Sequence, residues 1–250
     1  MSDSTALVNG AHAEHEHPPY QKHHFASMEQ QVDTTSFAMW LFLLTEIMFF
    51  GGLFCSYLIF RNWYYPAFVA ASHQLNIFWG TLNTGVLITS SFTMAMGVWC
   101  AEMRKKSGLV LCLVLTFLLG LVFLGIKYIE YSEKIEKHHV PGFHYSLKSF
   151  TDPASDEEVH KSYPEDKPLD AGMARHTELY FSLYFAMTGM HALHMIIGIG
   201  LLGYLIIRAR AGAYTTGHVT FVHNFGLYWH FVDIIWIFLF PLLYLISRHP

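Results

Sequence analysis

A single carboxyl group, that of Glu46, lies in the middle of a long apolar stretch, where a charged side chain is unusual. Phe42, Leu43, Phe49 and Phe50 surround it on the neighbouring helical positions. An isolated carboxylate near the centre of a membrane costs several kcal/mol, so we expect this side chain to be protonated. Two uses remain open: a protonation or lipid-contact site, or a neutral carboxyl hydrogen bonded to a neighbouring helix.

Two pairs of polar side chains, each with a spacing of three residues, occur later in the chain. His191 and His194 form one pair, and His230 and Asp233 form the other. Imidazole and carboxylate groups can bind transition metals. Neither pair, however, matches the zinc-protease helix pattern, which has two histidines four residues apart with a glutamate between them. We favour hydrogen bonds between helices, with Asp233 orienting a histidine.

No pattern in the sequence predicts a haem, metal or catalytic site. The CxxCH motif for haem attachment is absent, and nothing singles out an opposed pair of histidine ligands. Five histidines lie in the polar residues 1–35, and a His-rich tract can bind metal. Nothing in that segment enforces a coordination geometry, so we expect residues 1–35 to be a flexible cytoplasmic tail without a signal peptide.

The elements that position these side chains are five long apolar segments. Of the 250 residues, 53% are hydrophobic and 14% are charged, whereas a soluble domain carries about 25% charged residues. About 20 apolar residues are needed to span a bilayer as a helix, and the continuous runs exclude a β-barrel. The sequence therefore predicts an all-α, polytopic membrane protein, a bundle of five transmembrane helices in residues 36–250. The helices are expected at about 36–60, 75–99, 108–131, 179–207 and 225–247.

Basic residues in the short loops predict the orientation. Five of them lie between helices two and three or between helices four and five: Arg104, Lys105, Lys106, Arg208 and Arg210. The opposite side offers only Arg61 and Arg248, so we expect a cytoplasmic N-terminus. The net charge of −4 gives no support for nucleic-acid binding.

A long external loop is expected at about 132–178. Between Asp152 and Asp170 it carries seven acidic residues against two lysines. Such a loop could attract a basic soluble electron carrier. The alternative, which we favour, is a solvated loop that packs against a neighbouring subunit.

Five segments, in order along the chain, resemble subunit III of haem–copper respiratory oxidases. They are WLFLLTEIMFFGGLF (40–54), LNTGVLITSS (82–91), KYIEYSE (127–133), TGMHALHMIIG (188–198) and YWHFVDIIWIFLF (228–240). Together they cover most of the chain from Phe37 onward. Ala192 stands where the family usually has glycine. The forms around Thr45–Phe50 and Tyr228–His230 favour the cytochrome c type.

The resemblance implies a non-catalytic subunit that stabilises subunit I and holds phospholipid near its proton and oxygen routes. The whole complex would reduce dioxygen to water and pump protons, with haem and copper in subunits I and II. On this interpretation Glu46 lies near a lipid cleft, and the interhelical polar contacts come from Glu130, His191, His194, His230 and Asp233. Further partners would be a small subunit IV, and a cytochrome c or a larger respiratory supercomplex.

The chain departs from the common form of this family in having five helices instead of seven. The first two helices of the longer form are missing, which favours a bacterial cytoplasmic membrane. The lipid cleft of the seven-helix form then needs another subunit to complete it. Three alternatives remain: subunit III of a quinol oxidase, the accessory protein of nitric oxide reductase, and a proton-coupled transporter. The transporter is least favoured, because neither inverted repeats nor broken helices are found.

Overall fold

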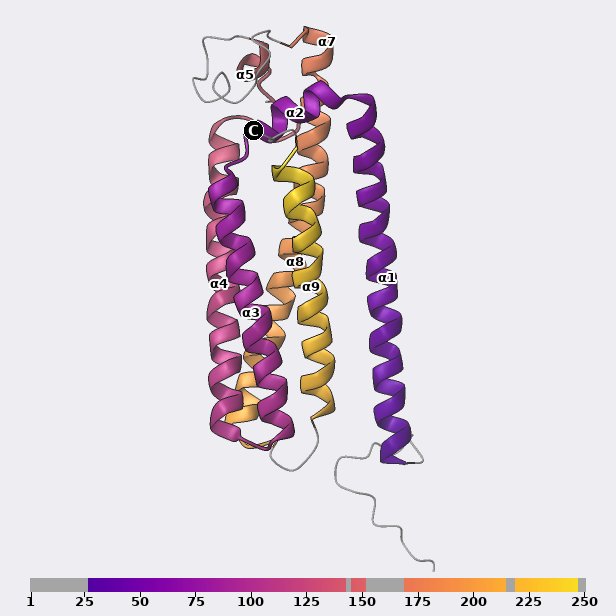
Figure 1. The fold of residues 1–250 in the computed structure, drawn as a ribbon, viewed down its shortest axis with the longest axis vertical. Coiled ribbons are helices and arrows are strands. Elements are labelled where there is room, and N and C mark those ends of the chain that lie inside the picture. The colour runs from indigo at the N-terminus through magenta and orange to yellow at the C-terminus, as the bar shows by residue number, and fades with distance from the viewer. Residues whose placement is uncertain (1–26, 143–144, 152–168, 215–218, 247–250) are drawn as a thin grey trace, which may run out of the picture.

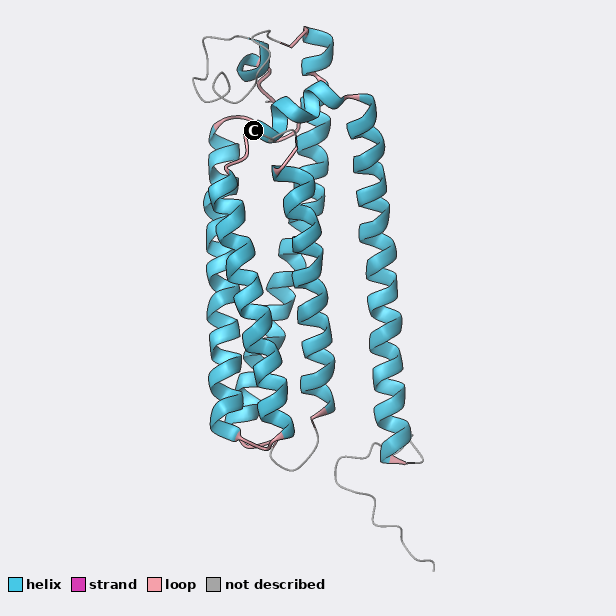
Figure 2. Ribbon diagram, in the orientation of Figure 1, coloured by secondary structure: helices cyan, strands magenta, loops and turns pink. Residues whose placement is uncertain are grey.

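All regular structure in the described part of this computed structural model is helical (Figure 2). The structure describes residues 27–142, 145–151, 169–214 and 219–246. The N-terminal histidines lie outside these ranges, as do six of the seven acidic residues between Asp152 and Asp170; Asp170 itself is described. The helices are α1 (Met28–Trp63), α2 (Tyr65–His73), α3 (Ile77–Glu102), α4 (Lys106–Glu136), α5 (Lys148–Thr151), α7 (Ala171–Ala174), α8 (His176–Arg210) and α9 (Thr220–Tyr244).

The prediction of five long apolar helices is confirmed: α1, α3, α4, α8 and α9 are all long and apolar enough to cross a membrane. Most of them extend beyond their predicted ends. Helix α1 begins at Met28 instead of residue 36, and Ser27 caps it by accepting a hydrogen bond from the Gln30 main-chain N–H at 3.1 Å. At about 1.5 Å per residue, its 36 residues extend about 54 Å, well beyond a hydrocarbon core of about 30 Å. Hydropathy marks only the part of a helix that lies in lipid.

The short helix α2 was not predicted. It lies at the end of the bundle opposite the start of α1, between α1 and α3 (Figure 1). Pro66 occupies its first turn, where the missing N–H has no intrahelical partner to lose. Ala67, Phe68 and Ala71 are fully buried. With nine residues, α2 is too short to span a bilayer. Its buried apolar side chains cover the end of the bundle.

Helix α9 supplies much of the core between α3, α4 and α8. Trp229 and Trp236 are fully buried, and their indole N–H groups donate to Ser90 Oγ at 3.0 Å and Thr84 Oγ1 at 3.1 Å on α3. Gly198 of α8 leaves room for the Trp229 ring, because a Cβ atom there would lie 3.0 Å from the indole. The polar atoms of both tryptophans are thus satisfied inside the bundle.

Helix α1 stands apart from the other four long helices in Figure 1, and among these it packs mainly against α8 and α9. Only Leu43, Phe50 and Tyr57 of its described residues are buried, at intervals of seven. The Tyr57 hydroxyl donates to the Leu242 carbonyl oxygen of α9 at 2.7 Å. The rest of α1 is therefore available to lipid or to another subunit.

Candidate functional site

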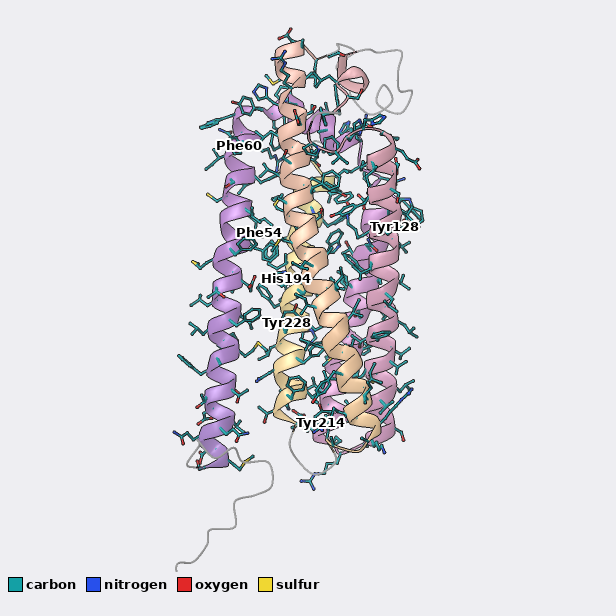
Figure 3. The ribbon with its side chains drawn as sticks, turned by 180° about the vertical axis from the view of Figure 1, so that it is seen from behind. Phe54, Phe60, Tyr128, His194, Tyr214 and Tyr228 are labelled. Carbon is teal, nitrogen blue, oxygen red and sulfur yellow. The ribbon has the colours of Figure 1, made fainter. Side chains whose placement is uncertain are left out.

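A cavity of about 550 Å³ lies between α1 and the pair α8 and α9. Its walls are mostly apolar, with Met39, Phe42 and Phe49 from α1, Met190, Leu193, Ile197 and Leu201 from α8, and Phe221 and Phe225 from α9. Its polar side chains are Glu46, His194, Asn224 and Tyr228. We call this space the α1 cleft. Figure 3 shows His194 and Tyr228 in the space between α1 and its neighbours, with Phe54 of α1 on the same side.

Glu46 and His194 meet across the α1 cleft. Glu46 Oε2 lies 3.2 Å from His194 Nε2, and the side chains are 19% and 11% exposed, so both reach the cleft. His194 Nδ1 lies 2.8 Å from the Met190 carbonyl oxygen, which can only accept a hydrogen bond. Nδ1 therefore carries a proton.

A hydrogen bond between the two facing atoms requires one further proton, at Nε2 or at Oε2. Either neutral His194 accepts from a protonated Glu46 at Nε2, or an imidazolium donates to a carboxylate. In both cases one proton lies between the two groups and the pair has no net charge. Neutrality removes most of the cost of placing a carboxyl group inside a membrane.

Aromatic residues hold the pair in place. The Phe50 ring lies 5.6 Å from the His194 imidazole, and Phe42 lies 6.2 Å from Tyr228. The Tyr228 hydroxyl donates to the main-chain oxygen of His194 at 2.8 Å, which connects α9 to α8 beside the pair. The cleft thus presents the Glu46–His194 pair, with Asn224 and Tyr228, at a mostly apolar surface.

A second polar centre is buried within the protein. It is formed by Lys127, Glu130, Tyr184 and Tyr244. Lys127 Nζ donates to Glu130 Oε2 at 2.9 Å, to Tyr244 at 3.0 Å and to Tyr184 at 3.2 Å. Both tyrosine hydroxyls also donate to Glu130 Oε1, that of Tyr184 at 2.9 Å. Lys127 and Glu130 are 3% and 2% exposed. All three donors of the ammonium group are used, which is how a buried ion pair is tolerated.

The remaining predicted residues do not join the α1 cleft. His230 Nδ1 lies 2.7 Å from Ser91 Oγ of α3. His191 is buried against Phe123 and Trp236, with ring centroids 5.4 and 5.3 Å away, and Asp233 is also buried. Within the described ranges, no hydrogen bond reaches either nitrogen of His191. Asp233 lies beside Ser91, the residue that His230 also contacts, and all three line one cavity.

His191 and His194 therefore face different helices. His194 contacts α1, whereas His191 packs on α4 and α9, because residues three apart on a helix point about 60° away from each other. No group of three or more His, Cys, Asp or Glu side chains in the described part of the chain could hold a metal ion.

The sequence interpretation missed Lys127, Tyr184 and Tyr244. The spacing of Lys127 and Glu130 in KYIE gives a local signal, because residues three apart on a helix are neighbours. The two tyrosines come from α8 and α9, so only the packing of those helices on α4 brings them there.

Comparison with known proteins gives consistent matches. Residues 169–248 match the family described as Cytochrome c oxidase subunit III. The chain is 31% identical over 209 residues to cytochrome c oxidase subunit 3 of Thermostichus vulcanus, covering 83% of this chain and 85% of that one. It is 30% identical over 250 residues to the Synechocystis protein of the same name, covering 98% and 83%. A probable subunit 3 from Nocardia farcinica is 31% identical over 82% of this chain and 85% of its own.

Proposed function

We propose a lipid-holding role for the α1 cleft, on the premise that this chain belongs to the cytochrome c oxidase subunit III family. It is a non-catalytic, multi-pass subunit of a respiratory terminal oxidase, in a complex with subunits I and II. The predicted family, and the predicted role as a subunit of a respiratory terminal oxidase, are thus confirmed, and the transporter alternative is rejected.

The observation that carries the proposal is the 3.2 Å contact of Glu46 with His194 in a mostly apolar cavity of about 550 Å³. The apolar walls suit an acyl chain, and the pair offers a hydrogen-bonding group without a net charge. Helix α1 has few buried residues of its own, so an acyl chain in the cleft would add contact between α1 and the pair α8 and α9. A surface of subunit I or II would close the open side of the cleft.

The orientation and the membrane are part of the same proposal. The α3–α4 connection, the end of α8 and the start of α1 lie at one end of the bundle (Figure 1), and this end carries the five basic residues Arg104, Lys105, Lys106, Arg208 and Arg210. Basic residues are retained on the cytoplasmic side, so this end faces the cytoplasm. The relatives are bacterial, which supports the bacterial cytoplasmic membrane.

The test replaces Glu46 and follows the whole oxidase complex. In Glu46→Ala, we expect subunit I to co-purify in full stoichiometry and the initial turnover rate to stay within about twofold. The number of bound phospholipids per complex falls, and activity decays several-fold faster during sustained turnover. Unchanged lipid content together with unchanged decay would refute the proposal.

Two further variants sharpen this test. Thr45→Val is the matched control, because the Thr45 hydroxyl donates to the Phe42 carbonyl oxygen of its own helix at 2.6 Å and to no other group in the described part of the chain. Glu46→Ala and His194→Ala should give the same loss, and the double variant no additional one, because either change breaks the same pair. Additive losses would mean that the two residues act separately.

A further inference from the structure

A second groove, of about 630 Å³, lies where the end of α8 meets the start of α4. We call it the α4 groove. It is lined by Lys106, Ser107, Val110, Leu111, Val114 and Arg210. The polar residues lie at the end of the bundle, and the apolar residues follow further along α4. Lys106, Val110 and Val114 follow one another at intervals of four along α4, and Ser107 and Leu111 are also four apart. The five residues therefore form one continuous strip from the membrane boundary toward its interior.

The polar part of the α4 groove carries the two positive charges of Lys106 and Arg210, which are both exposed. None of the described residues that line the groove is acidic. Glu102, an acidic residue at the same end of the bundle, faces His223, whose Nε2 lies 3.3 Å from Glu102 Oε1. The neighbouring Lys105 ammonium lies 5.0 Å from the Trp99 ring centre. Lys106 and Arg210 thus define a local site within a generally basic end of the bundle.

We propose that the α4 groove binds a negatively charged phospholipid. Its phosphate group lies between the Lys106 ammonium and the Arg210 guanidinium, with the Ser107 hydroxyl as a further donor. One acyl chain follows Val110, Leu111 and Val114 toward the membrane interior. Basic pockets at the ends of membrane helices select such headgroups, and the apolar strip distinguishes a lipid from a soluble phosphate.

The α4 groove is independent of the α1 cleft. The groove is formed by α4 and α8, the cleft by α1, α8 and α9, and the two share no lining residue. The groove selects by charge, whereas the cleft offers a neutral pair. A variant in one site therefore leaves the other intact, and the two proposals can fail separately.

The test uses the intact oxidase complex, freed of bound lipid in mild detergent. It is titrated with phosphatidylglycerol or with phosphatidylcholine of the same acyl chains, and native mass spectrometry counts bound lipids. We expect phosphatidylglycerol to be preferred. The variant Lys106→Gln/Arg210→Gln lowers the affinity for phosphatidylglycerol about 30-fold and leaves phosphatidylcholine unchanged. The control Arg104→Gln/Lys105→Gln removes the same charge from the same end and changes the affinity by less than about twofold.

A second pair of variants tests the acyl-chain part without altering charge. Val114→Trp fills the apolar part of the α4 groove and weakens phosphatidylglycerol binding. Leu118→Trp, one turn further along α4 and outside the groove, does not weaken it. An equal loss in both double glutamine variants would show general attraction to a basic surface and overturn the proposal. Equal affinity for the two lipids, or an unaffected Val114→Trp variant, would also overturn it.

Discussion

Removing the ammonium group of Lys127 should destabilise the protein far more than removing a comparable surface charge. Lys127 is 3% exposed and donates to Glu130, Tyr184 and Tyr244. In Lys127→Met, Glu130 keeps its two tyrosine donors but loses its only cation partner in the described part of the structure. Breaking a buried ion pair from one side costs about 3–5 kcal/mol, because a buried charge is left uncompensated.

The same helix offers a matched control. Lys137 and Glu133 also form an ion pair at 2.9 Å, but their side chains are 33% and 38% exposed. Lys134 lies 3.8 Å from Glu133 as well, so the carboxylate keeps a second cation nearby. We expect Lys137→Met to cost less than about 1 kcal/mol, because water and salt screen an exposed pair.

A third variant separates the lost charge from the lost packing. In Lys127→Met/Glu130→Gln, a neutral amide replaces the carboxylate and still accepts from the tyrosines. We expect it to be at least about 1 kcal/mol more stable than Lys127→Met alone. Stability is measured on the purified complex by thermal unfolding, and on the chain by its resistance to denaturing detergent. Equal effects of Lys127→Met and Lys137→Met, or a double variant less stable than the single one, would refute the reasoning.

Two further predictions concern packing and pH. Gly198→Leu should lower the free energy of unfolding by about 3 kcal/mol or more, because a Cβ atom would lie 3.0 Å from the Trp229 ring. Gly200→Leu on the same helix has open space around it and should change stability by less than about 1 kcal/mol, as thermal unfolding of both variants will show. Burial lowers the pKa of His139 to about 4, and the nearby positive charges of Lys134 and Lys137 add to this effect. The unfolded chain, with its ordinary pKa near 6.5, then binds more protons, so stability is full above about pH 6.5 and falls toward pH 4, by up to about 3 kcal/mol. His139→Phe should flatten this profile between pH 4 and 6.5; an unchanged slope would show that other groups cause it.

Much of the fold could be predicted because the bilayer imposes a length on every spanning helix. Each of the five runs is recognised from its apolar residues alone. Hydropathy did not predict the parts of helices that lie beyond the lipid, such as the polar first turns of α1 from Met28 to Thr35. It also did not predict α2, whose apolar residues cover the bundle end instead of spanning the bilayer.

The candidate site was only half predictable. Glu46 was conspicuous because a carboxyl group in an apolar run needs a reason. Its partner was not identifiable, because His191 and His194 have the same local surroundings and differ only in the direction they face. The buried polar centre at Lys127 shows the same limit: the lysine and the glutamate are neighbours in sequence, whereas their two tyrosines are not.

The sequence by itself determined that the chain is a bundle of five membrane helices, and which of its residues are too polar to face lipid. Both follow from the cost of leaving polar groups in hydrocarbon, which depends on residue type and position along a helix. Only the tertiary structure decided which of those residues meet. The rotation and separation of α1 against α8 and α9 place Glu46 3.2 Å from His194 and leave a cavity beside them. These quantities arise from the packing of side chains far apart in the sequence, so no local pattern encodes them.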